Sequence, residues 1–135
     1  MSDLWVDANV LLRLITKEPD DLYQRALRLA EQAERGEVTL KLSPLVVAEI
    51  VWVLVSFYKY SRTQVSEVLL SLVTAQGVDL QETDLVIAAL DSMARVNVDF
   101  VDAFLAETVR RKGGAVASFD RDFRRLGVPW IEPRD

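Results

Sequence analysis

An almost unbroken apolar run, SPLVVAEIVWVLVSFY from Ser43 to Tyr58, limits what this chain can fold into. Every side chain between Leu45 and Val55 is apolar except that of Glu49. Because a membrane span needs roughly 18 or more apolar residues, we expect the run to form a buried helix. A lone carboxylate in such a helix must face a cleft, pair with an arginine or take up a proton.

The rest of the chain alternates short apolar segments with amphipathic helical segments. We expect strands at residues 4–6, 38–43, 78–80, 115–118 and 128–133, the first of them buried and the last at an edge. Helices are expected at residues 9–16, 19–36, 44–58, 61–77, 83–96 and 99–114, with a short one before Gly127. This order predicts an α/β fold with a mostly parallel sheet.

Length and composition narrow the class of protein. The chain has 135 residues, of which 50% are hydrophobic, and contains no linker or repeat, so we expect a single domain over residues 1–135. Its N-terminus lacks the basic start of a signal peptide, and we expect a cytoplasmic protein with no membrane partner. The net charge of −5 argues weakly against non-specific binding to nucleic acid, although residues 110–135 form a locally basic segment.

Cysteine and histidine are both absent from the sequence. Their absence excludes disulfides, thiolate nucleophiles, zinc sites built on these residues and a Ser-His-Asp triad. An enzyme of this composition must therefore use carboxylates, hydroxyls, lysine, arginine or a hard cation held by oxygen atoms.

Four acidic residues are hard to explain as surface charges. Asp7 and Asp120 each follow an expected strand, where ligands bind in open parallel sheets. Capping of the next helix is an equally good explanation for Asp7. Glu49 lies well inside its helix, and Asp102 shares a helix face with Leu105, Ala106 and Val109, which we expect to be buried.

Two further acids are weaker candidates. Asp99 lies one turn before Asp102, in a position that favours interaction with the helix dipole over ligand binding. Asp122 is expected to cap the short helix and to point away from Asp120. If Asp7, Glu49, Asp102 and Asp120 meet in one cleft, their charges repel one another unless a cation neutralises them. Magnesium or manganese is the expected occupant, since both prefer carboxylate and water oxygens.

Four segments in order, VDANVLLRLI, SPLVVAEIVWVL, DFVDAFLAETVRRKGG and VASFDRDFRRLGV, resemble the PIN-domain ribonucleases, in particular the VapC-type toxins of toxin–antitoxin pairs. The resemblance implies a three-layer α/β/α sandwich with four or five parallel strands, and a Mg²⁺- or Mn²⁺-dependent endonuclease acting on single-stranded RNA. It implies that Asp7, Glu49, Asp102 and Asp120 bind the metal, with Asp99 beside them. Asn9 and Ser118 match polar positions near the metal, and a cognate antitoxin is the implied protein partner.

Basic residues near the C-terminus are candidates for holding flanking phosphates of the RNA. Surface solvation and pairing with the helix dipole explain any one of them equally well. The six candidates are Arg110, Arg111, Lys112, Arg121, Arg124 and Arg125.

Two other functions remain open from the sequence. A non-catalytic PIN-fold module that binds RNA or protein is one, and a magnesium-dependent phosphoryl-transfer domain of receiver or haloacid-dehalogenase type is the other. The second fits less well, because neither class explains Glu49 and the phosphatase motif requires an aspartate where Asn9 stands. We also expect a homodimer, for which Trp52, Phe57 and Tyr58 are candidate contacts, although core packing is the favoured role of these three.

Overall fold

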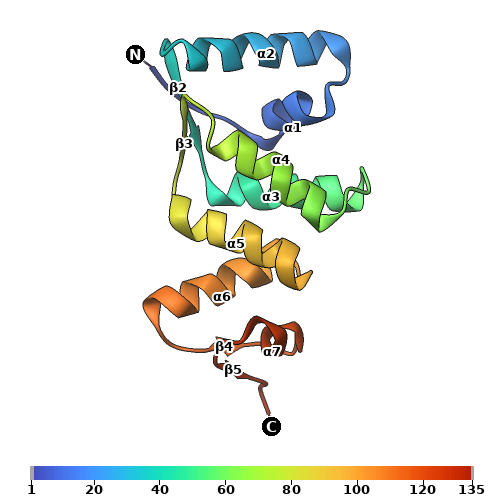
Figure 1. Cartoon of the computed structure of the whole chain (residues 1–135), viewed down its shortest axis with the longest axis vertical. Coiled ribbons are helices and arrows are strands. Elements are labelled where there is room, and N and C mark those ends of the chain that lie inside the picture. The colour runs from blue at the N-terminus through green and yellow to red at the C-terminus, as the bar shows by residue number, and fades with distance from the viewer. Residues whose placement is uncertain (1, 135) are drawn as a thin grey trace.

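The computed structural model describes residues 2–134 and shows the expected alternation of strands and helices (Figure 1). The first part of the chain runs through β1 (Ser2–Trp5), α1 (Ala8–Thr16), α2 (Asp20–Glu34), β2 (Val38–Leu42), α3 (Pro44–Ser56), α4 (Arg62–Val73) and β3 (Val78–Leu80). The second part runs through α5 (Thr83–Val96), α6 (Phe100–Lys112), β4 (Val116–Ala117), α7 (Asp122–Leu126) and β5 (Trp130–Ile131). The prediction of an α/β fold with parallel strands is confirmed.

The start of α3 follows directly from its sequence. The Ser43 hydroxyl accepts a hydrogen bond from the Leu45 N–H at 3.2 Å, and Pro44 takes the first helical position, where its missing N–H costs nothing. The polar start of α4 is equally local, because Ser61 and Gln64 form both bonds of a capping box. The Ser43 cap fixes the start of α3 directly after β2. It therefore also fixes the position of Glu49, which lies on α3.

The five strands form two separate sheets. In the first sheet β2 lies between β1 and β3, with Leu40 beside Leu4 and Leu42 beside Leu80. In the second, β4 pairs only with β5. The expected single sheet of four or five strands is therefore wrong for this conformation. Within residues 2–134, neither β4 nor β5 pairs with a strand of the first sheet.

The burial of β1 also differs from the prediction. All four of its residues are exposed, and the Trp5 side chain is 59% exposed, whereas Leu40 and Leu42 of β2 are buried. A strand becomes buried only when neighbours cover both its edges and its faces. β1 has β2 on one side and no strand on the other within the described residues, so its side chains remain in solvent.

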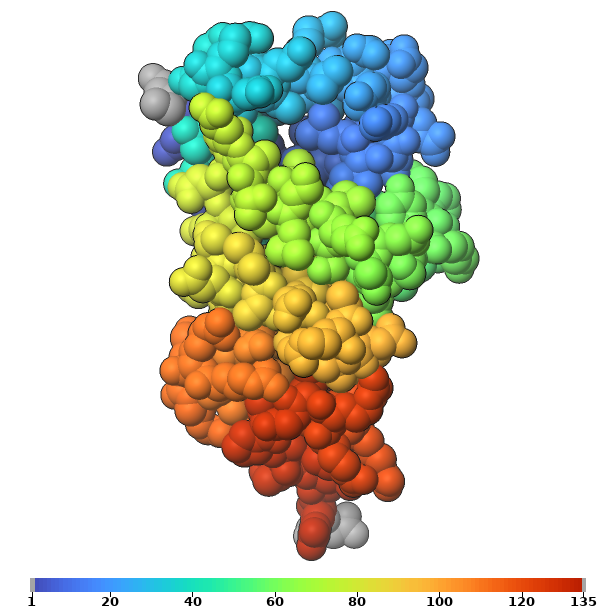
Figure 2. Space-filling view, viewed as in Figure 1, coloured from blue at the N-terminus to red at the C-terminus, as the bar shows by residue number. Residues whose placement is uncertain are grey.

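The second part of the chain extends away from the first sheet. In Figure 1, α5 and α6 lie between the β1–β2–β3 sheet and the β4–β5 pair, and in Figure 2 the chain passes from one end of the molecule to the other in successive bands. One buried cluster nevertheless runs through the molecule, from Leu11 and Ile50 to Leu90 and Phe123. No helix in the part of the chain described here is long and apolar enough to cross a membrane.

Two expectations about burial are wrong. The buried side of α6 carries Phe100, Ala103, Ala106 and Glu107, while Leu105, expected on that side, is 42% exposed. The helix packs against α5 with this side, so part of the expected stripe faces solvent. The aromatic residues of α3 and its C-terminal end are also more exposed than core packing requires. Trp52 is 68% and Phe57 is 73% exposed, and Tyr58 is half-buried.

Candidate metal centre

Three acidic side chains converge where β4 ends. One carboxylate oxygen from each of Asp102, Asp120 and Asp122 lies within 4.8 Å of the others. Asp102 comes from the first turn of α6, Asp120 from the turn after β4, and Asp122 from the first position of α7. Asp102 and Asp122 are half-buried and Asp120 is exposed, so this three-acid cluster opens to solvent on one side.

Hydrogen bonds within the turn explain why the cluster forms. The Ser118 hydroxyl accepts from the Asp120 N–H, and a carboxylate oxygen of Asp120 accepts from the Asp122 N–H, both at 2.9 Å. The carbonyl of Ser118 also accepts a bond from the indole N–H of Trp130 at 2.8 Å. Ser118 therefore holds the turn through its hydroxyl and its carbonyl, and its predicted role beside a metal stays a prediction.

The three carboxylates of the cluster could hold a cation, because their charges crowd one another. Partial burial, together with the nearby charges of Asp120, Asp99 and Asp122, raises the pKa of Asp102 from 3.8 to about 6. A hydrogen bond with Asp120 adds to this effect. Carboxylates this close stabilise a proton or a metal ion at the expense of the free anions, so the cluster has a built-in affinity for positive charge.

The first two predicted acids lie in a different place. Asp7 and Glu49 line one open pocket of about 360 Å³ together with Asn9 and Arg13, and we call it the N-terminal pocket. Glu49 is exposed, so the structure places it on a cleft and not in the core. Asp7 caps α1, because one of its carboxylate oxygens accepts from the Val10 N–H at 3.2 Å.

Arg13 is the functional candidate that the sequence analysis missed. Its guanidinium donates to the Asn9 side-chain oxygen at 3.2 Å and to the Glu18 carbonyl at 2.7 Å. Its Nε is buried and finds no hydrogen-bond partner within residues 2–134. The signal in the sequence was the spacing, since Arg13 follows Asn9 by one helical turn on the helix that Asp7 caps. Arg13 lines the same pocket as Asp7 and Glu49 and provides the N-terminal pocket with a positive charge.

Two of the four predicted acids, Asp102 and Asp120, lie together in the three-acid cluster, and the meeting of all four in one cleft stays a prediction. Neither Asp7 nor Glu49 joins the three-acid cluster, and the only acidic group of that tightness among the described residues contains Asp122 in their place. Asp102 also lines a groove of about 170 Å³ between α3 and α6, and Trp52 of α3 lines the same groove. Asp7 follows β1 and Asp120 follows β4, and these two strands belong to different sheets within residues 2–134.

Of the two weaker candidates, Asp122 lies in the three-acid cluster and Asp99 does not. Asp122 was expected to point away from Asp120, but α7 begins at Asp122 and turns its carboxylate into the cluster. Asp99 does not belong to the cluster and instead pairs with Arg62 at 2.7 Å, which joins the start of α6 to the start of α4. Asp99 still acts on the site through its charge, since it contributes to the raised pKa of Asp102.

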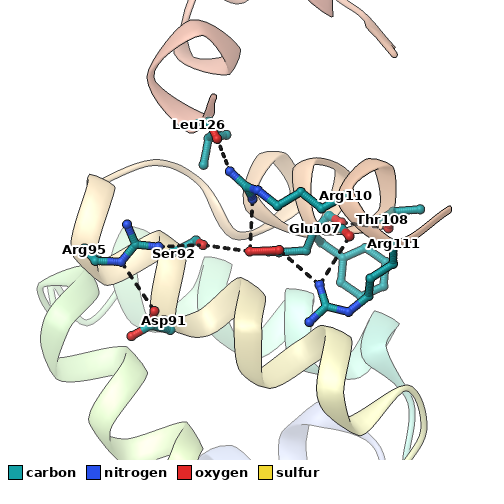
Figure 3. A network of polar contacts seen from close by, with 9 residues as sticks. Asp91, Ser92, Arg95, Glu107, Thr108, Arg110, Arg111 and Leu126 are labelled. Carbon is teal, nitrogen blue, oxygen red and sulfur yellow. Dashed lines mark hydrogen bonds and ion pairs between the residues drawn. The ribbon is translucent and has the colours of Figure 1, made fainter. Parts of the chain in front are cut away.

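The six basic candidates divide by their existing partners. Figure 3 shows Arg110 and Arg111 bound to the buried Glu107, with N–O distances of 3.0 and 3.1 Å. Arg125 pairs with Asp122 at 3.2 Å, and the Arg124 guanidinium stacks over the Trp130 ring. The two remaining candidates are exposed, and their side chains have no partner within the described residues. They are Lys112 and Arg121.

The donor set fits magnesium or manganese. All three ligands are oxygen atoms, and the ligand oxygens of an octahedral ion with bonds of about 2.1 Å stand about 3 to 4.2 Å apart. The 4.8 Å limit of the cluster is close to that spacing, so small side-chain rotations bring the three oxygens onto one ion. The open side leaves room for water and for an oxygen of a substrate.

Comparison with known protein families and with curated proteins gave one match. A family model described as PIN domain matches residues 4–129, which includes both the N-terminal pocket and the three-acid cluster. No curated protein matches the chain. Since the family model covers nearly all of the sequence, the chain belongs to the PIN domain family.

Proposed function

We propose that this protein is a Mg²⁺- or Mn²⁺-dependent endoribonuclease that cleaves single-stranded RNA by hydrolysis. Membership of the PIN domain family supports a nuclease at the general level. The observation that carries the proposal is the three-acid cluster, in which the pKa of Asp102 is raised to about 6 by burial and by its acidic neighbours. Such a group of oxygen ligands serves a hard cation better than it serves stability.

The chemistry follows from the residues present. When bound, the metal supplies a Lewis acid that acidifies water and offsets the charge of the phosphate under attack. Asp102, Asp120 and Asp122 would hold that ion. The Ser118 hydroxyl keeps Asp120 in position by accepting a hydrogen bond from the Asp120 backbone N–H. The oxygen of water forms a bond to phosphorus, the bond from phosphorus to the 3′ oxygen breaks, and that oxygen takes a proton. The products carry a 5′-phosphate and a 3′-hydroxyl.

Positive side chains complete the RNA site. Lys112 and Arg121 are exposed and without partners among residues 2–134, so they are suited to flanking phosphates. Arg13 offers a partly buried guanidinium beside Asp7 and Asn9. Its place in the N-terminal pocket is suited to another phosphate of the RNA.

Within this activity we propose the toxin role of a toxin–antitoxin pair, in the cytoplasm. The support is the resemblance of four ordered segments to VapC-type toxins. The partner is then a cognate antitoxin that offers an arginine to the acidic residues. Growth arrest on expression, relieved by co-expression of a short neighbouring reading frame, is the expected result. Unimpaired growth at high expression would leave a housekeeping nuclease as the better assignment.

The direct test is cleavage of single-stranded RNA by the purified protein in 5 to 10 mM Mg²⁺ or Mn²⁺, concentrations of the order that weak carboxylate sites require. We expect products with 5′-phosphate ends, lost in EDTA and reduced at least about 100-fold by Asp120→Asn. Glu67→Gln, which changes an exposed acid on α4 by the same charge, is the matched control and should retain activity. Equal product in EDTA, or none with either metal, would replace the nuclease by a non-catalytic PIN-fold module.

A further inference from the structure

Three aromatic side chains gather just after the end of α3. Phe57 and Tyr58 follow its last residue directly, and Tyr60 comes after Lys59. Phe57 is 73% exposed, and Tyr58 and Tyr60 are half-buried. An exposed ring beside two partly exposed ones forms an apolar patch of the kind that marks binding surfaces.

Backbone hydrogen bonds hold this aromatic segment in one conformation. The Val53 carbonyl accepts from the N–H groups of Phe57 and Tyr58, at 2.9 and 3.2 Å. The Leu54 carbonyl accepts from the Tyr60 N–H at 2.9 Å. The rings of Phe57 and Tyr58 meet edge to face with centroids 5.0 Å apart, and Tyr58 makes a second such contact with Tyr60. A ligand that stacks on Phe57 therefore meets a ring whose position is already fixed, so binding costs little conformational entropy.

Phe57 and Tyr58 belong to the lining of the N-terminal pocket, which has a volume of about 360 Å³. Val53 of α3 adds apolar surface to the same pocket, and α1 adds polar groups, among them those of Asn9 and Arg13. A cleft of this size, lined by aromatic and apolar side chains with a few polar groups among them, is typical of a ligand site.

Two basic side chains near the aromatic rings favour a ligand that carries negative charge. Arg13 lines the pocket, and its buried Nε–H has no acceptor within residues 2–134. A buried N–H without an acceptor costs free energy, which an oxygen atom of a ligand would recover. Lys59 directly follows Tyr58, is exposed, and has no side-chain partner among the residues that the structure describes. Aromatic rings next to basic side chains are the means by which proteins bind single-stranded nucleic acid.

The acids of the pocket narrow the ligand further. Asp7 and Glu49 also line the pocket, so a small anion such as inorganic phosphate would be repelled by both and would gain nothing from the rings. A nucleotide within a strand combines one negative charge with a large uncharged base. Its base can lie on the rings while its phosphate reaches Arg13 or Lys59.

We propose that the N-terminal pocket binds one unpaired base of the RNA, stacked on the exposed ring of Phe57, with an adjoining phosphate at Arg13 and Lys59. This inference deepens the proposed nuclease function and rests on it for the identity of the ligand. A base inside a duplex is covered on both faces by its neighbours and is not free to stack on a side chain. The pocket therefore selects single-stranded RNA, and it does so with little regard to sequence, because every base has a face that stacks.

Binding of RNA to variants of Phe57 tests the stacking contact. Asp120→Asn, which is expected to lose cleavage, serves as the background, so that the affinity is measured on intact RNA. The anisotropy of a labelled single-stranded RNA of mixed sequence gives this affinity in Mg²⁺. Phe57→Ala and Phe57→Leu should each weaken binding at least about 5-fold, because leucine keeps apolar surface but has no ring. Phe57→Trp should bind at least as tightly as the background. Trp5→Ala, which removes an exposed ring outside the pocket, is the matched control and should leave the affinity unchanged.

The preference between single and double strands separates stacking from a structural role of Phe57. The background protein should bind the single strand at least about 10-fold more tightly than a duplex of the same composition. Phe57→Ala should reduce this ratio, because binding of the duplex does not use the ring. Lys59→Gln should reduce the slope of log affinity against log salt by about 0.7, the value for one phosphate of a single strand. A structural defect would weaken the binding of both forms of RNA alike.

The outcomes distinguish this inference from the proposed nuclease function. Unchanged affinity in both Phe57→Ala and Phe57→Leu, or an unchanged preference for single strands, would overturn the base site. A fall from dimeric to monomeric mass in Phe57→Ala, with RNA binding intact, would overturn it too and would assign Phe57 to a contact between two copies. If the wild-type protein cuts RNA but binds it independently of Phe57, only the base site fails. If binding depends on Phe57 but the wild-type protein cuts no RNA, only the nuclease fails, and absence of binding to any RNA would reject both.

Discussion

Replacing Asp102 by asparagine should stabilise the metal-free protein, because the native fold places this carboxylate where its charge is unfavourable. Burial and the charges of Asp120, Asp99 and Asp122 raise the pKa of Asp102 from 3.8 to about 6. A displacement of this size corresponds to about 3 kcal/mol if all of it acted on stability. Screening by solvent at this half-buried position leaves roughly 1 to 1.5 kcal/mol. Asp102→Asn should raise the free energy of unfolding by that amount at pH 7.5.

The sign of the pH dependence follows from the same pKa. Between pH 3.8 and about 6 the native protein binds the Asp102 proton more tightly than the unfolded chain does. This group therefore lowers the free energy of unfolding as the pH rises through that interval, and its penalty is complete above pH 6. The advantage of Asp102→Asn should be largest at pH 7.5, should shrink between pH 6 and pH 4, and should be mostly gone at pH 4.

Urea unfolding of the wild type and the variant in EDTA, at pH 7.5 and pH 4, measures this difference. Glu67→Gln is the control for removal of one negative charge from the surface, and it should change the free energy of unfolding by less than about 0.5 kcal/mol. A destabilised Asp102→Asn, or a gain that is the same at both pH values, would contradict the reasoning. Asp102 would then be a structural hydrogen-bonding group and not one of several crowded anions.

Three more predictions concern other parts of the molecule. Burial alone would raise the pKa of Glu107, but Arg110 and the hydrogen bonds to the carboxylate lower it. Glu107→Gln should therefore lower the free energy of unfolding by about 1 to 2 kcal/mol in urea at pH 7. This loss should become smaller as the pH falls through the native pKa of Glu107. Gly77→Ala should lower the free energy of unfolding by more than about 2 kcal/mol in the same assay, because the new Cβ would clash with the Ala33 carbonyl oxygen. Gly114→Ala has open space around the new Cβ and should lower it by about 1 kcal/mol. Addition of 10 mM Mg²⁺ or Mn²⁺ should raise the thermal midpoint by about 2 to 6 °C, and Asp102→Asn should abolish the shift.

Local features of the fold were predictable from the sequence, and one non-local feature was not. The Ser43 cap, the capping box at Ser61 and the strand Val38–Leu42 all depend on neighbouring residues, and the structure contains each of them. Whether β1 meets β4 depends on groups more than a hundred positions apart. It also depends on the Glu107 contacts that hold the C-terminal segment on α5. Neither the periodicity of the sequence nor its helix caps predict which strands pair or how the Glu107 contacts place the C-terminal segment.

The candidate site shows the same division. Residue type and position after a strand identified Asp7 and Asp120, because a parallel strand presents its last residues at one edge of the sheet. The same reasoning placed Asp122 outside the site, since it assumed that a helix starting there would turn its carboxylate away. The bond from the Asp122 N–H to the Asp120 carboxylate tightens that turn and brings the two side chains together. The position at which α7 starts thus decides whether the Asp122 carboxylate lies in the three-acid cluster.

A hydrogen bond from the backbone does not use up an acidic side chain at the strand ends of this protein. The sequence offers two explanations for an acid after a strand, a helix cap or a metal ligand, and treats them as alternatives. In the structure one oxygen of Asp7 accepts the Val10 N–H, and one oxygen of Asp120 accepts the Asp122 N–H. The second oxygen of the Asp7 carboxylate has no hydrogen bond within residues 2–134. Each bond from a backbone N–H fixes the orientation of its carboxylate, and at Asp7 it leaves the second oxygen available for another contact.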